Sequence, residues 1–380
     1  MHFGFNEEQK MLQEAIRNFA EKEIAPLLDE AEAKAEFPVQ IFPKMGELGY
    51  LCLCYPAKYG AADMGLVGEC IATEELNRVG GGIADGPRLQ AGLGTRAIFE
   101  HGSEEQKQKY LVPAIKGQKI AAFGLTEPNA GSDVAAVETT AVKKGDKYII
   151  NGTKMYITSG TICDFVIIAA YTDKSLGTRG GMSMLIVDKD TPGFSRRKLA
   201  KFCFHSSDTA ELTFEDCAVP VDNLVGEEGR GFAYFMETLD AARITHSAAS
   251  IGIAQAAYEA CLSYVQQRVQ FGQPIYKFQI NSFKLAKMAT AIEAARWLMY
   301  RAAWLYDQGA RRFNEAAMTK LVASEVAAWV ANEAMQIHGG VAFMAESPVH
   351  RYFRDARLKT LTEGTSEIMQ LVIARGIGLR

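Results

Sequence analysis

The spacing of apolar residues changes twice along this chain, and these two changes limit the possible folds more than any other feature. From about residue 5 to residue 118, apolar side chains recur at steps of three and four, which predicts amphipathic helices packed by one face. The spacing is seen in Met11, Leu12, Ala15, Ile16 and Phe19. We therefore expect an N-terminal helical domain over residues 1–118.

The middle of the chain has a different pattern. Short apolar runs rich in β-branched residues stand between loops that contain glycine and aspartate, which is typical of buried strands. We expect strands at 147–151, 165–170 and 182–187, with the first ending in a turn at Gly152. These strands predict a middle β domain over residues 119–228, built as a small barrel or sandwich.

From about residue 229 onward the chain is rich in alanine and contains few residues that break helices. Three long periodic segments predict helices over 232–268, 277–309 and 315–338. Gly339 and Gly340 follow the third segment and can end it with a left-handed cap. Long antiparallel helices with short links form bundles. We therefore expect a C-terminal four-helix bundle over residues 229–380 and an α+β fold for the whole chain.

Charge and composition exclude several functions. The 380 residues include 41 Lys and Arg against 45 Asp and Glu, a net charge of -4, which is a poor basis for nucleic-acid binding. The chain has neither a secretory signal nor an apolar run long enough for a membrane span, so we expect a cytoplasmic protein. Its seven cysteines lack CxxC spacing and its six histidines lack HExxH spacing, which favours a reducing compartment and no metal site.

Motifs for several common chemistries are absent. The sequence has no GxGxxG after a predicted strand, no P-loop motif and no GxSxG elbow. It therefore indicates neither a Rossmann dinucleotide site nor a P-loop. The glycine run at 80–82 is interpreted as a turn between two helices.

Three segments carry a resemblance to a known family. They read GLTEPNAGSDVAA at 124–136, RVQFGQPIYKFQ at 268–279 and LTEGTSEIMQLVIARG at 361–376. In this order and spacing, the chain resembles the acyl-CoA dehydrogenase family over nearly its whole length. The resemblance implies an FAD enzyme that oxidises an acyl-CoA thioester to its trans-2-enoyl-CoA. It also implies a homo-oligomer, usually a tetramer, that passes electrons to an electron-transfer flavoprotein.

The resemblance implies that Glu363 is the catalytic base. Loss of the α-proton beside a thioester carbonyl requires a carboxylate that is held close to the carbon and partly desolvated. Gly364, which follows it, lets the backbone approach the substrate, and the backbone N–H of Glu363 would bind the thioester oxygen. Some relatives carry the base on an earlier helix, at the position of Ala242, which has no group that could accept a proton.

The resemblance also implies two sets of cofactor contacts. The first set would bind the FAD of the same subunit and consists of Phe123, Leu125, Thr126, Ser132, Tyr156, Thr158, Thr365 and Glu367. The second set would reach the FAD of a neighbouring subunit and consists of Arg268, Phe271, Gln279, Gln336, Gly339 and Gly340. An arginine suits a pyrophosphate because it offers paired donors.

Substrate contacts are implied at several further positions. Ser132 and Gly364 match substrate-side residues, and Asp240 and Arg243 resemble the family's pair on the CoA side. Without the resemblance, Asp240 and Arg243 would be a surface pair one helical turn apart. Asp85 and Arg88 fall in the stretch that lines the acyl pocket of relatives. Their plainest interpretation is an ion pair at the surface.

Departures from the family pattern concern the acyl group. Thr362 stands where many relatives have a tyrosine, which leaves room for a branched or cyclic acyl chain. If Asp85 and Arg88 face the pocket, they would contact a polar or cyclic acyl group, and Asp85 could serve as a second base. Ala342 and His205 replace a common glycine and arginine and are treated as local changes.

Several activities stay open at this point. We expect a dehydrogenase for a short, branched or cyclic acyl-CoA. Alternatives are a dehydrogenase of the cyclohexane- or cyclohexene-carboxyl-CoA type or of aromatic acyl-CoA type, and the same site run in reverse as an enoyl-CoA reductase. An acyl-CoA oxidase would release hydrogen peroxide. A family member without catalysis would serve as a flavin-binding scaffold.

Overall fold

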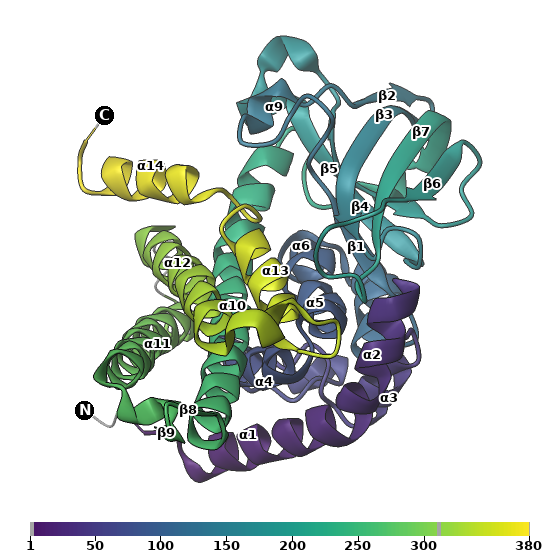
Figure 1. Cartoon of the computed structure of the whole chain (residues 1–380). Helices are drawn as coiled ribbons and strands as arrows, with labels where there is room; N and C mark the ends of the chain where they lie inside the picture. Colours follow the sequence, from purple (N-terminus) through teal and green to yellow (C-terminus); the bar gives the residue numbers. More distant parts are fainter. Residues whose placement is uncertain (1–3, 310–312, 380) are drawn as a thin grey trace.

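The N-terminal part of the chain is helical. A computed structural model describes residues 4–309 and 313–379 (Figure 1). The first helix begins at a capping box, in which the side chains of Asn6 and Gln9 each accept a bond from the other's backbone N–H. The helices are α1 (Glu7–Phe19), α2 (Ala25–Lys34), α3 (Ile41–Glu47), α4 (Gly65–Val79), α5 (Gly81–Leu89), α6 (Arg96–His101), α7 (Glu104–Gln106) and α8 (Val112–Ile115).

The glycine run at 80–82 lies between two helices, as expected. Gly80 ends α4, and Gly81 already belongs to α5. A π segment at Gln90–Gly94 follows α5 directly. Short segments of this kind often occur beside functional sites. The other π and 3-10 segments are Ala20–Ile24, Ala57–Tyr59, Lys107–Leu111, Val134–Ala136, Lys174–Leu176, Val221–Asn223, Ile275–Lys277 and Gly339–Phe343.

The middle of the chain forms one curled, mixed sheet of seven strands in the order β1-β4-β2-β3-β7-β6, with β5 paired to β4 (Figure 1). Strand β1 runs parallel to β4, whereas β3 and β7 are antiparallel. The strands are β1 (Ala121–Gly124), β2 (Thr140–Lys144), β3 (Lys147–Thr158), β4 (Phe165–Tyr171), β5 (Met182–Asp188), β6 (Phe194–Lys198) and β7 (Thr209–Pro220), and the short helix α9 (Thr178–Gly181) precedes β5. The strands expected at 165–170 and 182–187 are therefore confirmed.

The expected turn at Gly152 is wrong. Strand β3 continues through Gly152 to Thr158, and its register against β7 shifts at this point. Gly152 has φ +152°, and a Cβ there would lie 2.3 Å from the hydroxyl of Thr139. The glycine therefore permits a bulge and a close strand contact instead of ending the strand.

The C-terminal part is a helical bundle, and the three long helices predicted from the sequence are present. They are α10 (Gly231–Gln267), α11 (Gln279–Asp307) and α12 (Phe313–His338), followed by α13 (Val349–Lys359) and α14 (Ser366–Gly376). Gly339 has φ +59°, as the left-handed cap requires. A two-stranded hairpin of β8 (Val269–Gln270) and β9 (Gln273–Pro274) links α10 to α11.

Helix α10 is the central element of the structure, since it contacts α4, α5, α11, α12 and α13 (Figure 1). The helical, strand and helical order confirms the expected fold class. Within the described parts of the chain, no helix combines the length and apolarity that crossing a membrane requires.

Candidate active site

Glu363 lies in a tight loop between α13 and α14. The loop is closed by a bond of 3.1 Å from the backbone N–H of Ser366 to the carbonyl of Thr360. Glu363 has φ +56° and Gly364 φ +100°, both in the left-handed region. This region is unfavourable for a glutamate and costs on the order of 1–3 kcal/mol. The surrounding contacts must hold the residue in this conformation.

Two cations hold the backbone of this loop. The Nε of Arg243, on α10, donates to the carbonyl oxygen of Glu363 over 3.3 Å. The Nζ of Lys320, on α12, donates to the carbonyl oxygen of Gly364 over 2.6 Å. Burial lowers the pKa of Lys320 to about 8. Helices α10 and α12 therefore fix the position of the loop from two sides.

Arg88 holds the carboxylate of Glu363, whose side chain is 7% exposed, and His246 lies next to it. The Nη1 of Arg88, on α5, lies 2.8 Å from Oε1, and the Nδ1 of His246, on α10, lies 3.5 Å from the same oxygen. Burial would raise the pKa of Glu363, but the positive charge of Arg88 and its hydrogen bond to Oε1 outweigh burial and lower this pKa to about 2.

The second carboxylate oxygen of Glu363 is in a different situation. Oε2 is buried and has no hydrogen-bond partner among the residues that the structure describes, and the same holds for Nδ1 of His246. The Nε2 of His246 lies 2.9 Å from the carbonyl oxygen of Lys359, so this nitrogen carries the hydrogen. Burial lowers the pKa of His246 to about 4, which keeps the ring neutral near pH 7. Glu363 therefore presents one buried oxygen that is free to accept a proton.

Asp85 and Arg88 form an ion pair, but the expected surface location is wrong. Both residues are buried, 8% and 4% exposed. The Oδ1 of Asp85 lies 3.0 Å from Nε and 2.9 Å from Nη2 of Arg88, and it accepts a bond of 3.2 Å from Lys359. Burial would raise the pKa of Asp85, but the two cations hold it well below its usual range. A carboxylate of this kind is a poor second base.

The surface interpretation of Asp240 and Arg243 is wrong for the same reason. Each residue is 7% exposed, and Nη1 of Arg243 lies 3.3 Å from Oδ1 of Asp240. The pair is buried because the middle of α10 is covered by neighbouring helices on several sides. Arg243 also donates to the carbonyl oxygen of Glu363, so it helps to position this loop.

An apolar wall lies beside these charges. Leu93, Leu239 and Ala242 form a small buried cluster of their own. Phe123 and Leu125, from the end of β1 and the loop after it, pack against this cluster together with Leu89 and Met236. Ala242 therefore faces side chains that were expected at the flavin. The wall joins the strand domain to helices α5 and α10.

Several of the first set of expected cofactor residues lie near the ends of strands β1 and β3. The backbone N–H of Met155 donates to the carbonyl of Thr126 over 2.8 Å, which places the β1 loop beside the end of β3. The register of β3 shifts between Lys154 and Ile157, and Tyr156 within this bulge has φ +60° and is 66% exposed. Thr158 is half-buried. An exposed aromatic ring beside half-buried apolar side chains is a surface that a flat ring system such as a flavin fits.

The remaining residues of this set flank the same region. Ser132 is exposed in the loop after β1, and Glu367 is exposed in the first turn of α14. Thr365 caps α14, since its hydroxyl accepts the backbone N–H of Ile368 over 3.3 Å.

The second set of cofactor residues lies at the other end of the bundle. Arg268 follows the last residue of α10, 25 positions after Arg243, which corresponds to roughly 37 Å along the helix. Phe271 is 92% exposed in the β8–β9 hairpin, far from β1 in Figure 1. The hydroxyl of Tyr264 donates to the carbonyl of His338, which brings the end of α12 to the same place. Exposed residues of this group also include Gln279, Gln336, Gly339 and Gly340.

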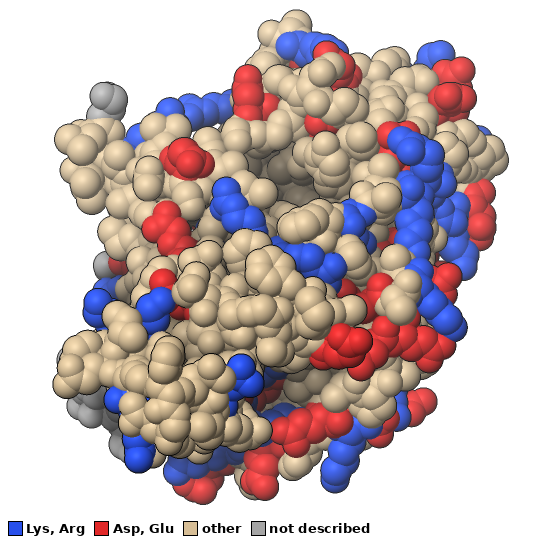
Figure 2. All heavy atoms as spheres, in the orientation of Figure 1, with Lys and Arg blue, Asp and Glu red and all other residues tan. Residues whose placement is uncertain are grey.

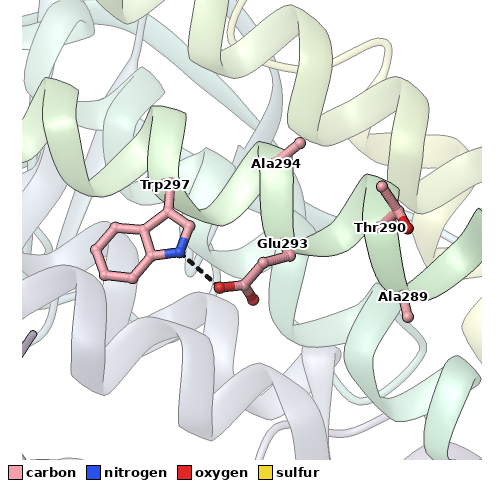
Figure 3. A pocket seen from close by; sticks show the side chains of 5 residues that line it. All are labelled: Ala289, Thr290, Glu293, Ala294 and Trp297. Carbon is pink, nitrogen blue, oxygen red and sulfur yellow. Dashed lines mark hydrogen bonds between the residues drawn. The ribbon is translucent and has the colours of Figure 1, made fainter. Parts of the chain in front are cut away.

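The surface is hollowed where the strand domain meets the C-terminal helices. Figure 2 shows this recess, with Lys and Arg side chains near its rim. A second hollow lies on the outer face of α11 and is lined by Ala289, Thr290, Glu293, Ala294 and Trp297 (Figure 3). There the indole N–H of Trp297 donates to Glu293 over 2.5 Å. All the residues that line it belong to one helix and none of them contacts Glu363.

One group of possible metal ligands occurs in the described residues. Atoms of Glu100, His101 and Glu237 lie within 4.8 Å of one another, and His101 stacks on Tyr234. His101 Nε2 lies 3.0 Å from a carboxylate oxygen of Glu237. The expectation that the protein has no metal site stays a prediction.

Three residues of the site were not predicted from the sequence: His246, Lys320 and Lys359. His246 follows Arg243 by one helical turn, and Lys359 precedes Glu363 by four residues. Charged or polar residues within otherwise apolar helical stripes were the available signal. Lys320 interrupts the apolar stripe of α12 in the same way and is fully buried.

Three family models match the chain: the N-terminal domain of acyl-CoA dehydrogenase over residues 6–118, the middle domain over 122–217 and the C-terminal domain over 229–378. A relative from Anaerotignum propionicum, named acryloyl-CoA reductase (NADH), is 43% identical, and the alignment covers 99% of this chain and 96% of the relative.

Two solved structures are similar over the whole fold. Butyryl-CoA dehydrogenase from Megasphaera elsdenii has a TM-score of 0.97 and 40% identity, with 99% of this chain and 100% of that chain covered. A chain in a structure of the electron transferring flavoprotein of Acidaminococcus fermentans has a TM-score of 0.97 and 43% identity, with both chains covered completely. With three family models that together span most of its length, the chain belongs to the acyl-CoA dehydrogenase family.

Proposed function

We propose that the protein is an FAD-dependent dehydrogenase of a short acyl-CoA and that Glu363 is its catalytic base. The observation that carries the proposal is the Oε2 atom of Glu363, which is buried and lacks a hydrogen-bond partner among the described residues. Burial without a hydrogen-bond partner favours the neutral form of a carboxylate, so this oxygen is the atom that would accept the proton. The neighbouring apolar wall provides a surface for the acyl chain.

In the proposed reaction, the bond between the α carbon and its hydrogen breaks, and the proton moves to Oε2 of Glu363. The bond between the β carbon and its hydrogen breaks as well, the hydride leaves with its electron pair, and a carbon–carbon double bond forms. FAD, when bound, supplies the acceptor for the hydride. Arg243 and Lys320 fix the carbonyl groups of Glu363 and Gly364 and so position both the carboxylate and the backbone N–H that would bind the thioester oxygen.

FAD would be held by residues from two subunits. Tyr156 and Thr158, at the end of β3, and Thr126, in the loop after β1, would contact the FAD of their own subunit. The exposed group around Phe271 lies at the opposite end of the bundle. We therefore propose a homo-oligomer, with a tetramer as the expected form, in which each site receives the second group from a neighbour. Large apolar side chains on α11 are exposed and would pack between subunits: Ile280, Phe283, Trp297 and Trp304. The hollow in Figure 3 lies on this helix.

The proposed electron acceptor and the alternative direction of the reaction are based on relatives of this chain. Electron-transfer flavoprotein is the proposed acceptor of the electrons from the reduced flavin. This proposal is based on the structure of such a flavoprotein in which one chain is similar to the whole of this chain. The reverse reaction, enoyl-CoA reduction, stays the alternative direction, because one 43% identical relative is named acryloyl-CoA reductase (NADH). All seven cysteines are free thiols, which suits the proposed cytoplasmic location.

Specificity for a branched or cyclic acyl group remains part of the proposal. Thr362 is half-buried beside Glu363, and its hydroxyl donates back to Leu358 over 3.4 Å, so it projects less than a tyrosine would. Asp85 has two cationic partners, which argues against a second base at this position.

The test is anaerobic mixing of the purified holoenzyme with a panel of acyl-CoAs while the flavin absorbance is followed. The panel contains butyryl-, isobutyryl-, cyclohexanecarboxyl- and glutaryl-CoA, together with the matching enoyl-CoAs offered to the reduced enzyme. We expect at least one acyl-CoA to bleach the flavin and the Glu363→Gln enzyme to retain FAD without bleaching. A protein that binds FAD and reacts with no member of either set would refute the proposal.

A further inference from the structure

His246 is a fully buried histidine in the middle of α10, and only one of its ring nitrogens has a partner. Its Nε2 donates to the carbonyl oxygen of Lys359 over 2.9 Å, which leaves Nδ1 as an acceptor. Nδ1 is buried and has no hydrogen-bond partner among the described residues, which is costly for a polar atom. Packing alone does not explain why this acceptor is buried beside the Glu363 loop.

Nδ1 of His246 faces the carboxylate of the base. It lies 3.5 Å from Oε1 of Glu363, the oxygen that also accepts a bond of 2.8 Å from Nη1 of Arg88. While the ring is neutral and Glu363 is ionised, Nδ1 and Oε1 are both acceptors, and no hydrogen lies between them. The distance agrees with this, because hydrogen bonds between nitrogen and oxygen are usually about 2.7–3.2 Å long. One proton is missing for a hydrogen bond between the two atoms.

The proposed reaction supplies this proton. The α-proton moves to Oε2 of Glu363, and the neutral carboxyl then carries one O–H group. A half-turn about the Cγ–Cδ bond exchanges the places of the two oxygens, and this terminal torsion of a glutamate has only weak preferences. After the turn, the O–H points at Nδ1 of His246, and the hydroxyl oxygen keeps a lone pair for Arg88. The oxygen without a proton takes the place beside the substrate, and no covalent bond forms or breaks in this step.

We propose that His246 is a positioning residue for the base: its Nδ1 accepts a hydrogen bond from the protonated carboxyl of Glu363 and holds the abstracted proton away from the substrate. The inference rests on the proposed function and deepens it, since it states where the α-proton lies after it has left the substrate. In enoyl-CoA reduction, the same half-turn runs in reverse and brings the proton back beside the α carbon.

The charged groups around His246 keep its ring in the form that this role requires. Burial and the positive charges of Lys359 and Arg88 outweigh the attraction of Glu363 and lower the pKa of His246 to about 4. A protonated ring would carry a hydrogen on Nδ1 and could not accept one. Asp85, the other carboxylate nearby, is bound to Arg88 and Lys359. Arg88 thus stabilises the ionised form of the base, and His246 stabilises its protonated form.

An acyl-CoA that can lose only the α-proton tests the proposal. In 3-thiabutyryl-CoA a sulfur atom replaces the β carbon, so no β-hydride can be transferred and the reaction stops at the α-anion. This anion beside the oxidised flavin should give a long-wavelength charge-transfer band. The intensity of the band measures the ratio of anion to intact ligand, which is the equilibrium of the proton between the α carbon and Glu363.

The FAD-loaded enzyme would be compared with four variants that retain the flavin spectrum. His246→Leu and His246→Phe, which have no acceptor, should lower the ratio of anion to intact ligand at least about tenfold. His246→Asn, whose amide oxygen is an acceptor near the place of Nδ1, should stay within about threefold of the unaltered enzyme. The control Ser250→Ala removes a buried hydroxyl that donates to the backbone carbonyl of His246 over 2.8 Å, and it keeps the imidazole ring. It should leave the ratio unchanged.

Three results would overturn the inference. An equal ratio in His246→Leu and the unaltered enzyme would show that Nδ1 is not the partner of the protonated carboxyl. An equal loss in His246→Leu and His246→Asn would assign the effect to packing. Absence of the band from the unaltered enzyme would show that Glu363 does not hold the abstracted proton. Bleaching by butyryl-CoA would leave the proposed dehydrogenase intact in each case, whereas no reaction with any acyl-CoA or enoyl-CoA would overturn both.

Discussion

The ion pair between Arg88 and Glu363 should control the strength of the base. The two groups approach to 2.8 Å and are almost fully buried. With charge centres about 4 Å apart and an effective dielectric constant of about 20, the attraction is about 4 kcal/mol. One pKa unit corresponds to about 1.4 kcal/mol. The substitution Arg88→Gln should therefore raise the pKa of Glu363 by about three units from its present value of about 2. The pH below which the rate falls should rise by the same amount.

The assay is the rate constant of flavin bleaching by a low concentration of butyryl-CoA, measured anaerobically from about pH 5 to about pH 8. The unaltered enzyme should show a flat profile, because Glu363 stays ionised over this range. In Arg88→Gln the rate should fall as the pH falls, since a protonated Glu363 cannot accept the α-proton. At the alkaline end this variant should react at least about tenfold faster than the unaltered enzyme, because its base is stronger.

The control is Arg301→Gln, which removes the same charge from the surface of α11 and should leave the profile flat. Identical profiles for Arg88→Gln and the unaltered enzyme would refute the reasoning. That result would mean that Arg88 contributes little to the electrostatic potential at Glu363.

Three other perturbations have defined outcomes. Lys154→Met should lower the free energy of unfolding by about 3–5 kcal/mol in chemical denaturation, because it leaves the buried Glu127, 2.7 Å away, without its cation. The control Lys144→Met, on the exposed part of β2, should change the free energy of unfolding by less than about 0.5 kcal/mol. Burial raises the pKa of Asp355 to about 7, so its folded form holds a proton that the unfolded form has lost above about pH 4. Stability should therefore fall between about pH 4 and pH 7, by up to about 4 kcal/mol, and Asp355→Asn, which keeps the acceptor for the N–H of Phe204, should remove this fall; parallel curves for both proteins would contradict it. Gly364→Ala should slow flavin bleaching at least about tenfold, because Gly364 has φ +100° and the new Cβ would lie 2.6 Å from Met369, whereas Gly378→Ala, at φ +94° with nothing within 4 Å, should not.

The fold could be predicted because its signals are local. The long helices α10, α11 and α12 each repeat an apolar spacing over many residues, and the buried strands β4 and β5 are continuous β-branched runs. The wrong prediction of a turn at Gly152 also rested on local sequence alone. A glycine followed by polar residues looks the same whether it ends a strand or permits a bulge beside Thr139.

The site could be predicted only in part. The position of Glu363 followed from the resemblance of its segment, but the contacts that set its pKa join residues up to 275 positions apart. Asp85 and Arg88, like Asp240 and Arg243, are spaced by one helical turn, and that spacing is the same in a solvated pair and in a buried one. Burial of such pairs depends on which helices cover them, which is a property of the tertiary structure.

Exchange of the α-hydrogen is the most direct test of the central claim, that Glu363 takes this proton. The holoenzyme would be incubated anaerobically with butyryl-CoA and with glutaryl-CoA in deuterated water, and the deuterium at the α carbon would be measured by mass spectrometry and NMR. We predict incorporation at the α carbon of at least one thioester with the unaltered enzyme, and a rate about 100- to 10,000-fold lower with Glu363→Gln, which should keep its flavin spectrum. Exchange at the same rate in both proteins would contradict the account and assign the base to another residue.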